Sequence, residues 1–444
     1  MRHKSGSTMA APAMVLRQHG ILLWLLLLSF LSSSSSLSCM GRSDFLKTLE
    51  TISGILVTPR MPPPLVDTPL SQTASLTPVP LSSTTSTLSL SSSIDPGVSP
   101  WTVKVPLEEC SGGTVCVRLR VEGSLDKAKA RVYRAAVDTG SPYLVLGGNK
   151  DIVKGVRDSD GFVLDDSPYP PTEEVYGSQS GQIQWKVARL QIRSSDPAQR
   201  TRPLPSFIRS NRTILGLMDD QLEQEAGGTM LGLIRNPNIP RQKDYYRPTW
   251  LSQLTVQGTP TRSFSIDKEF LTLSSESLLP TSLQSKERQA VAPSLFRLVD
   301  IRPLGDFVDH YVCRVDRLVL NGSTTITSET VGGRPILAVL DTGLTGCLLT
   351  QDFWDALSEE AAIDPRRIRA LGVSVRDVTE GSTVEFLSGR AFNNLFYVAP
   401  ISLDWFFVKD PPYLVVMGQT FLSQGKLSVD TEDRLASFEV NEEL

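Results

Sequence analysis

Two segments of the chain each end an apolar run with the tripeptide Asp-Thr-Gly: "AAVDTGSPYLVL" contains Asp138 and "ILAVLDTGLTGCLLT" contains Asp341. One such motif is weak evidence, because an aspartate after a strand is often a turn residue or a helix cap. Two copies in similar surroundings predict a pair of adjacent carboxyl groups, which cannot both ionise cheaply and therefore share one proton. Such a pair can take a proton from water while polarising a carbonyl group, which is general acid–base catalysis.

The neighbouring residue types suit this chemistry. Gly140 and Gly343 allow the tight loops that would bring two backbones face to face, and Thr139 and Thr342 can form hydrogen bonds across to the opposite loop. A second repeat supports the pairing, because an apolar run ending in glycine follows each motif downstream, in "GTMLGLIRN" and "LVVMGQTFL". Each half of the chain therefore has the same order of features.

Most of the chain that must position these loops is predicted to be β-structure. Short runs that alternate apolar and polar residues, or are apolar throughout, are separated by turn residues from about Val98 onward. The expected strands lie in "TVKVPLEEC", "TVCVRLRVEG", "ARVYRAAVDTG", "QIQWKVARLQIR", "YVCRVDRLVLNG", "PILAVLDTG", "STVEFL", "YLVVMG" and "KLSVD". Helices are expected only in "RPTWLSQLTVQG", between Pro248 and Gly258, and in "TQDFWDALSEEAA", with Thr350 as N-cap. The length of this region favours two packed lobes over one.

Together these motifs resemble the pepsin-like family of aspartic proteases, from about Val98 to Leu444. The resemblance implies an all-β, bilobal fold with the active site in a cleft between the lobes, Asp138 and Asp341 as catalytic residues, and Thr139, Gly140, Ser141, Thr342 and Gly343 as loop support. "EVYGSQSGQIQWKV" resembles the flap hairpin, in which Tyr176 and Gly177 would contact substrate, although Tyr176 could also be an ordinary hairpin aromatic residue. The implied domains are residues 98–298 and 299–444.

The chain departs from the family pattern at two places near the dyad. Ser141 follows the first motif, and its hydroxyl can bond the outer oxygen of Asp138 as in the family. Leu344 stands at the second motif where the family has Thr or Ser, so that side loses a hydroxyl partner unless Thr345 replaces it. The family's tryptophan after the first motif is missing, with Val145 near its place, so the resemblance does not supply the hydrogen bond that steadies the flap tyrosine in the family.

The N-terminal part of the chain is interpreted as targeting sequence and linker. Residues 1–39 contain cations followed by the apolar run "ILLWLLLLSFL", which is short for a membrane span and typical of a signal peptide, with a retained anchor as the alternative. Residues 40–97 are rich in Ser, Thr and Pro and are expected to be a disordered linker, a propeptide, a transit segment or a glycosylated stalk. The expected location is the secretory pathway, extracellular or endomembrane, with an organelle such as a plastid as the alternative.

The five cysteines suggest at most two disulfides. Cys110 and Cys116 flank "SGGTV" and form either a hairpin disulfide or two free thiols, while Cys313 and Cys347 could pair only if the second motif lies beside the preceding strand. The sequons at Asn211 and Asn321 are compatible with N-glycosylation. We expect no metal site and no cofactor, since the cysteine spacing matches no metal site and two of the three histidines precede residue 21.

The expected function is an aspartic endopeptidase that hydrolyses extended peptide or protein substrates. The alternative is a pepsin-like binding or inhibitor protein with weak or absent catalysis, which the Leu344 substitution favours. The formal net charge of -4 and the lack of a basic run argue against nucleic acid as a partner. After signal cleavage we expect a monomer without stable membrane insertion.

Overall fold

The structure is a computed structural model that describes most of the chain after residue 99. The described residues are 58–59, 100–110, 113–123, 130–147, 164–176, 179–193, 207–218, 228–235, 247–256, 258–280, 294–305, 308–378, 382–391, 393–402, 408 and 410–441. The predicted targeting region lies outside them, as does the predicted linker apart from residues 58–59. All described residues belong to one compact unit, Ile52–Leu444.

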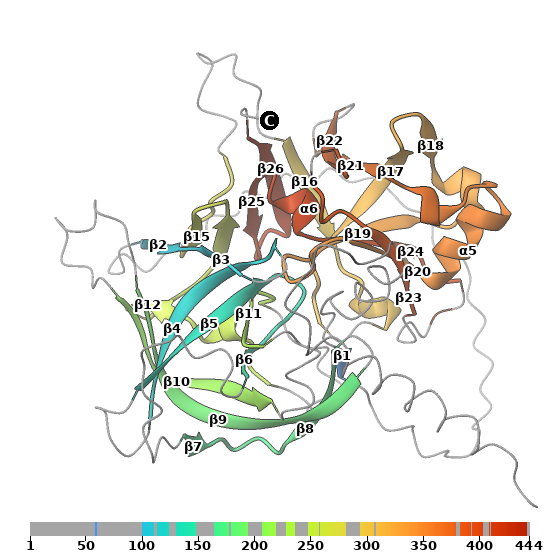
Figure 1. Cartoon of the computed structure of the whole chain (residues 1–444). Coiled ribbons are helices and arrows are strands. Elements are labelled where there is room, and N and C mark those ends of the chain that lie inside the picture. The colour runs from blue at the N-terminus through green and yellow to red at the C-terminus, as the bar shows by residue number, and fades with distance from the viewer. Residues whose placement is uncertain are drawn as a thin grey trace, which may run out of the picture. The chain divides into compact units, whose positions relative to one another are not determined.

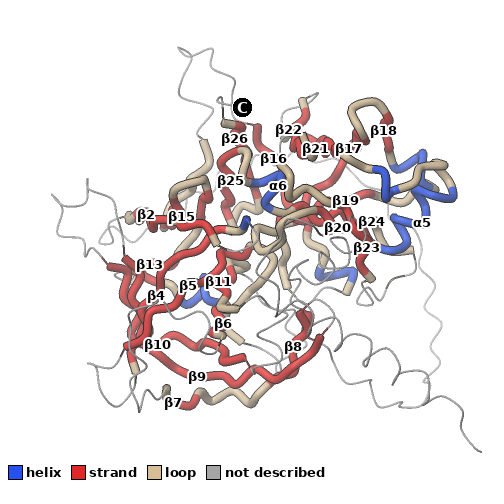
Figure 2. The backbone as a smooth tube through the Cα atoms, in the orientation of Figure 1, coloured by secondary structure: helices blue, strands red, loops and turns tan. Residues whose placement is uncertain are grey.

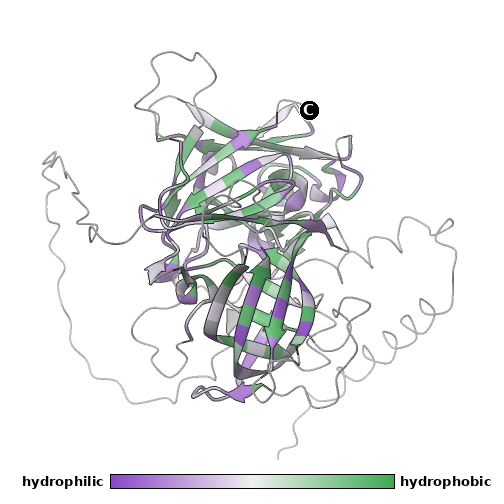
Figure 3. Cartoon of the chain, turned by 90° about the vertical axis from the view of Figure 1, so that its left-hand side faces the viewer, coloured by the Kyte–Doolittle hydropathy of each residue, from purple (hydrophilic) through white to green (hydrophobic). Residues whose placement is uncertain are grey.

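The fold is mainly β, as the sequence predicts: 53% of the described residues lie in strands and 11% in helices. Figure 2 shows the same excess of strand over helix. Each of the nine segments predicted as strands contains a strand. Along these strands hydrophobic and hydrophilic residues form alternating bands (Figure 3), which is the pattern of strands buried on one face.

Two large sheets contain nearly all of the strands (Figure 1). The ten-stranded sheet contains β1 (Thr58–Pro59), β3 (Glu108–Glu109), β4 (Val115–Glu122), β5 (Ala130–Asp138), β6 (Leu144–Leu146), β7 (Asp165–Asp166), β8 (Thr172–Tyr176), β9 (Gln179–Arg193), β10 (Phe207–Met218) and β11 (Met230–Gly232). A separate two-stranded ribbon pairs β12 (Thr255–Val256) with β13 (Thr259–Pro260).

The fourteen-stranded sheet takes its strands mainly from the second half of the chain. It contains β2 (Thr102–Pro106), β14 (Ser263–Ile266), β15 (Phe270–Ser274), β16 (Ser294–Val299), β17 (Val312–Leu320), β18 (Thr324–Ile326), β19 (Ile336–Leu340), β20 (Cys347–Thr350), β21 (Ala370–Arg376), β22 (Thr383–Gly389), β23 (Val398–Ile401), β24 (Tyr413–Met417), β25 (Gly425–Asp430) and β26 (Leu435–Val440). The early strand β2 joins this sheet through β15. Strand β2 is thus connected through β15 and β14 to the C-terminal strands β25 and β26.

Five strands have the same pairing pattern in both sheets. The order β4–β5–β11–β6–β10 in one sheet corresponds to β17–β19–β24–β20–β23 in the other. The directions also correspond, because β5 and β19 each pair antiparallel with the preceding strand of this order and parallel with the next, β11 or β24. The remaining pairs are antiparallel and then parallel in both sheets. The two apolar-glycine repeats are β11 and β24 with the glycines that end them.

Short helices fill the connections. The α-helices are α4 (Trp250–Gln253), α5 (Gln351–Glu359) and α6 (Gln419–Leu422), and the 3₁₀ helices are η5 (Arg302–Leu304), η6 (Ser328–Val331) and η7 (Pro365–Arg367). Helix α5 matches its prediction, but Thr350 caps it without a side-chain hydrogen bond. The helix predicted up to Gly258 is shorter than expected, because the chain after α4 enters the β12–β13 ribbon.

Most buried apolar side chains form one extensive core to which both sheets contribute. A smaller apolar cluster lies apart from this core and includes residues of β9 in the β8–β9 hairpin. It consists of Tyr143, Val145, Ile183, Trp185, Met218 and Met230, with Tyr169 and Ile214 packed against them. Strand β19 is buried along its whole length, which explains its continuously apolar sequence, whereas β5 is half-buried and becomes continuously apolar only in the three residues before Asp138.

Candidate functional site

The two Asp-Thr-Gly loops meet with their aspartates facing each other. Asp138 is the last residue of β5, and Asp341 directly follows β19. Each carboxyl group lies over the glycine of the opposite loop: a Cβ atom added at Gly140 would be 2.7 Å from Asp341 Cγ, and one added at Gly343 would be 2.7 Å from Asp138 Cγ. Only glycine therefore fits at these two positions without moving a carboxyl group.

Each aspartate is also held by its own loop. The N–H of Gly140 donates to Asp138 Oδ1 at 2.8 Å, and the N–H of Gly343 donates to Asp341 Oδ1 at 2.9 Å. Asp138 is fully buried and Asp341 is 1% exposed. The two sites are thus built in the same way, which agrees with the shared strand order around them.

The loops are joined by four hydrogen bonds from the two threonines. Thr139 N–H donates to Thr342 Oγ1 at 3.1 Å, and Thr342 N–H donates to Thr139 Oγ1 at 2.9 Å. The Thr139 hydroxyl then donates to Leu340 O, and the Thr342 hydroxyl donates to Val137 O, both at 2.7 Å. Each hydroxyl accepts from one loop and donates to the strand leading into it, so the relative position of the loops is fixed.

This geometry raises the pKa of both carboxyl groups. Burial is the main cause for each, and the pKa of Asp138 is raised further by the charge of Asp341 and by the hydrogen bond between the two groups. The backbone N–H groups of the loops oppose the rise. Two carboxyl groups in contact away from water hold one proton between them and titrate as a unit.

The hydroxyl support expected from Ser141 is absent. Ser141 Oγ is buried and makes no hydrogen bond within the described part of the chain, so the expected bond to Asp138 does not form. The side chain of Leu344 is also fully buried and offers no polar atom, but its backbone N–H lowers the pKa of Asp341. In this structure, neither residue that follows an Asp-Thr-Gly motif supports the dyad with a hydroxyl group.

The sequence-predicted flap segment is an antiparallel hairpin. Tyr176 ends β8 and is paired with Gln179 at the start of β9, while Gly177 and the side chain of Tyr176 lie outside the described residues. The pairing continues from Thr172, opposite Ile183. The structure therefore gives the hairpin but leaves the contact role of Tyr176 and Gly177 as a prediction.

A tryptophan does lie in this hairpin, but it stands on β9, within the predicted flap segment, and not after the first Asp-Thr-Gly motif. Trp185 on β9 donates from its indole N–H to Thr172 Oγ1 at 2.9 Å, and its ring meets Tyr143 edge-on at 4.9 Å. Val145, near the place of the tryptophan common in the family, packs in the same cluster. The tertiary structure was needed to find this, because Trp185 is distant in sequence from the first motif.

Two buried side chains of opposite charge, Glu174 and Arg247, lie beside this apolar cluster, and no sequence motif pointed to them. Glu174 on β8 is 2% exposed, and burial raises its pKa to about 7 although the Thr172 hydroxyl and Arg247 oppose the rise. Arg247 is also 2% exposed, donates to Pro170 O at 3.0 Å and lies over the ring of Tyr169. Arg247 therefore connects the segment before α4 to the chain leading into β8, and its charge acts on Glu174.

Outside the dyad, the cysteine and glycosylation predictions have mixed outcomes. The Cys110–Cys116 disulfide is present and confirms the prediction. Cys313 and Cys347 are both free and buried, so the pairing considered for them is wrong; β19 and β24 lie between their strands β17 and β20 in the sheet. Asn321 lies on an exposed turn, whereas the side chain of Asn211 on β10 is not described.

Nothing in the described ranges suggests metal binding: no three His, Cys, Asp or Glu residues are grouped so that they could hold an ion. No helix in these ranges is long and apolar enough to cross a membrane. The chain matches no protein-family model, and a search of curated proteins finds no significant relative.

Proposed function

We propose that this chain is an aspartic endopeptidase with a bilobal, pepsin-like fold. The observation that carries the proposal is the reciprocal seating of Asp138 over Gly343 and Asp341 over Gly140, on loops with the same hydrogen bonds. The shared strand order around the two loops supports two lobes that each supply one aspartate. A duplicated loop that buries two facing carboxyl groups has a large electrostatic cost, which catalysis would explain.

The reaction follows from one shared proton. The charged carboxyl takes a proton from a water molecule as the water oxygen attacks the peptide carbonyl carbon, while the protonated carboxyl donates to the carbonyl oxygen. The resulting tetrahedral intermediate collapses when the nitrogen of the leaving amine takes a proton from the protonated carboxyl, one hydroxyl of the intermediate returns its proton to the charged carboxyl, and the C–N bond breaks. The products are a carboxylic acid and an amine, and no covalent bond to the protein forms.

The surroundings support an extended peptide as substrate. The β8–β9 hairpin has the length and position in sequence of a flap, with Tyr176 and Gly177 at its tip as the proposed substrate contacts. The Cys110–Cys116 disulfide supports an oxidising compartment, in agreement with a secretory location and with N-glycosylation at Asn211 and Asn321.

A specific observation favours the second candidate, a pepsin-like binding protein with weak catalysis. Ser141 makes no hydrogen bond in the described residues, and Leu344 has no hydroxyl, so the charged dyad has fewer donors than the resemblance implies. Fewer donors make the charged form harder to reach, which lowers activity in acid.

One experiment distinguishes these functions. The purified chain is incubated with a peptide library at several acidic and neutral pH values, with and without pepstatin, and cleavage is followed by mass spectrometry. Endopeptidase activity predicts pepstatin-sensitive cleavage that Asp138→Asn and Asp341→Asn each abolish, because the amide keeps the shape but cannot share the proton. Asp355→Asn, an exposed site on α5, is the control for the chemical change. Full activity in either dyad variant would refute the assignment, and stable peptide binding without cleavage would favour the binding protein.

A further inference from the structure

His310 is the only histidine among the described residues, and neither the motif nor the resemblance assigns it a function. It lies between η5 and β17 and is 1% exposed. Its Nε2 atom is 3.1 Å from the carbonyl oxygen of Gly140. A carbonyl oxygen can only accept a hydrogen bond, so Nε2 must carry a proton, either in the Nε2–H tautomer or in the imidazolium ion.

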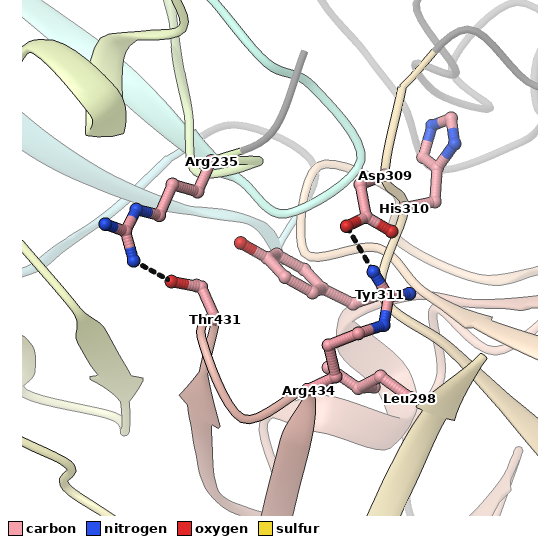
Figure 4. A pocket seen from close by; sticks show the side chains of 7 residues that line it. All are labelled: Arg235, Leu298, Asp309, His310, Tyr311, Thr431 and Arg434. Atoms are coloured by element: carbon pink, nitrogen blue, oxygen red, sulfur yellow. Dashed lines mark hydrogen bonds and ion pairs between the residues drawn. The ribbon is translucent and has the colours of Figure 1, made fainter. Parts of the chain in front are cut away.

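The residues on both sides of His310 are firmly anchored. Asp309 forms ion pairs with Arg434 and Arg302, and the Tyr311 hydroxyl donates to Leu233 O at 2.6 Å. Figure 4 shows Asp309 and Tyr311 directed toward the arginine side chains around a small cavity, while the imidazole of His310 points away from them. The ring is therefore presented toward the first Asp-Thr-Gly loop by a rigid segment.

The same segment also touches the second loop. The N–H of Leu340, the residue before Asp341, donates to the backbone oxygen of Tyr311 at 2.9 Å. Leu233, which accepts from the Tyr311 hydroxyl, donates its own N–H to Asp138 O at 2.8 Å. Residues 309–311 thus connect to the backbone of both aspartate loops.

We propose that His310 is a positioning residue for the dyad that holds the Gly140 loop and places a titratable positive charge beside Asp341. The inference rests on the proposed function for its role in catalysis, although the charge coupling itself does not. The carboxyl group of Asp341 lies directly over Gly140, whose carbonyl group contacts the imidazole. A protonated ring at this place favours the charged form of Asp341.

The charged groups around His310 show which carboxyl group its positive charge acts on. The positive charge of His310 lowers the pKa of Asp341, whereas His310 is not among the main causes that shift the pKa of Asp138. Asp309 is the nearest acid in sequence, but it is engaged by Arg434 and Arg302 on the other side of the segment. Arg235 lines the cavity there and pairs with Glu432, so its charge is also balanced away from the dyad.

The coupling can be measured without any assay of cleavage. In the full chain carrying His3→Gln and His19→Gln, His310 is the only histidine, so its ring C–H signals can be followed by NMR without overlap from another imidazole. Proton coupling is reciprocal, so loss of the Asp341 charge should lower the midpoint of the His310 titration by about 1 pH unit. Asp138→Asn is the matched control, because Asp341 can still carry a charge there and the midpoint should stay near that of the parent. An unchanged midpoint in Asp341→Asn would overturn the proposal whether or not the protein is a protease.

Cleavage assays then test the catalytic consequence. His310→Gln keeps an N–H donor but has no charge, so the acid limb of the pH profile of kcat/KM should move to higher pH. His310→Phe also removes the donor, so it should move the limb similarly and lower the plateau further. An acid limb that His310→Gln leaves in place would overturn the proposed role, even if the plateau fell through a purely structural effect.

Discussion

Thr139 and Thr342 each accept a hydrogen bond from the other's backbone N–H group, at 2.9 and 3.1 Å, and each hydroxyl donates onward to the strand that enters the opposite loop. Both side chains are buried. The pair therefore joins two parts of the chain that are far apart in sequence at the point where the carboxyl groups meet.

Thr139→Val should lower the free energy of unfolding by about 3 kcal/mol. The variant keeps the side-chain volume but removes a donor to Leu340 O and an acceptor for Thr342 N–H, and buried groups left without partners cost about 1–3 kcal/mol each. Urea unfolding measures the change. Thr139→Ser keeps the hydroxyl and should cost clearly less; a loss in Thr139→Val no larger than in Thr139→Ser would show that the hydrogen bonds of the hydroxyl contribute little to stability.

Gly140→Ala should reduce kcat/KM by about two orders of magnitude, since displacing a reacting group by about 1 Å has effects of this size. The new Cβ would lie 2.7 Å from Asp341 Cγ, so that carboxyl group must move. Gly258→Ala is the control, because its added Cβ meets no atom within 4 Å and only its positive φ angle causes strain. Unchanged kinetics in Gly140→Ala would show that the carboxyl position is not critical.

Leu344→Thr should move the acid limb of kcat/KM to lower pH, by about 1 pH unit. A hydroxyl that donates to the carboxylate of Asp341 favours its charged form and so lowers the pKa of the dyad. The measurement compares pH profiles of both proteins. Thr345→Val is the companion variant: if Thr345 already supplies this bond, its loss moves the acid limb upward and Leu344→Thr adds little. An acid limb unaffected by either change would exclude an electrostatic role for both residues.

Glu174 should make the protein less stable as the pH rises from about 4.5 to about 7. Its pKa is raised from 4.5 to about 7 in the folded state, mainly by burial, so the folded state binds more protons than the unfolded state in this window. The free energy of unfolding therefore falls by at most about 3 kcal/mol through this window and does not change with Glu174 above it.

Glu174→Gln should remove this loss, which urea unfolding at pH values below and above the window can measure. Glu173→Gln changes the exposed neighbour and should keep the pH dependence of the parent protein. Equal pH dependence in the parent and in Glu174→Gln would show that the carboxyl group titrates normally.

The sequence by itself determined the β-rich class, nine of the strands and the two aspartate loops. These features are local or repeated: period-two patterns and apolar runs mark individual strands, and Asp138 and Asp341 stand in matching surroundings. The Cys110–Cys116 disulfide also followed from a short separation in the chain. Side-chain chemistry and near neighbours were enough for these predictions.

Only the tertiary structure decided which distant groups meet. Arg247 and His310 belong to no motif, and the predicted flap segment does not reveal the partners of its own Glu174 and Trp185, because these environments arise from strands and loops that are remote in sequence. The tertiary structure also decided that Cys313 and Cys347 remain free thiols, because two strands separate them in the sheet. Hydrogen bonding, burial and charge coupling depend on distances that sheet pairing sets, and strand order cannot be read from the periodicity of single segments.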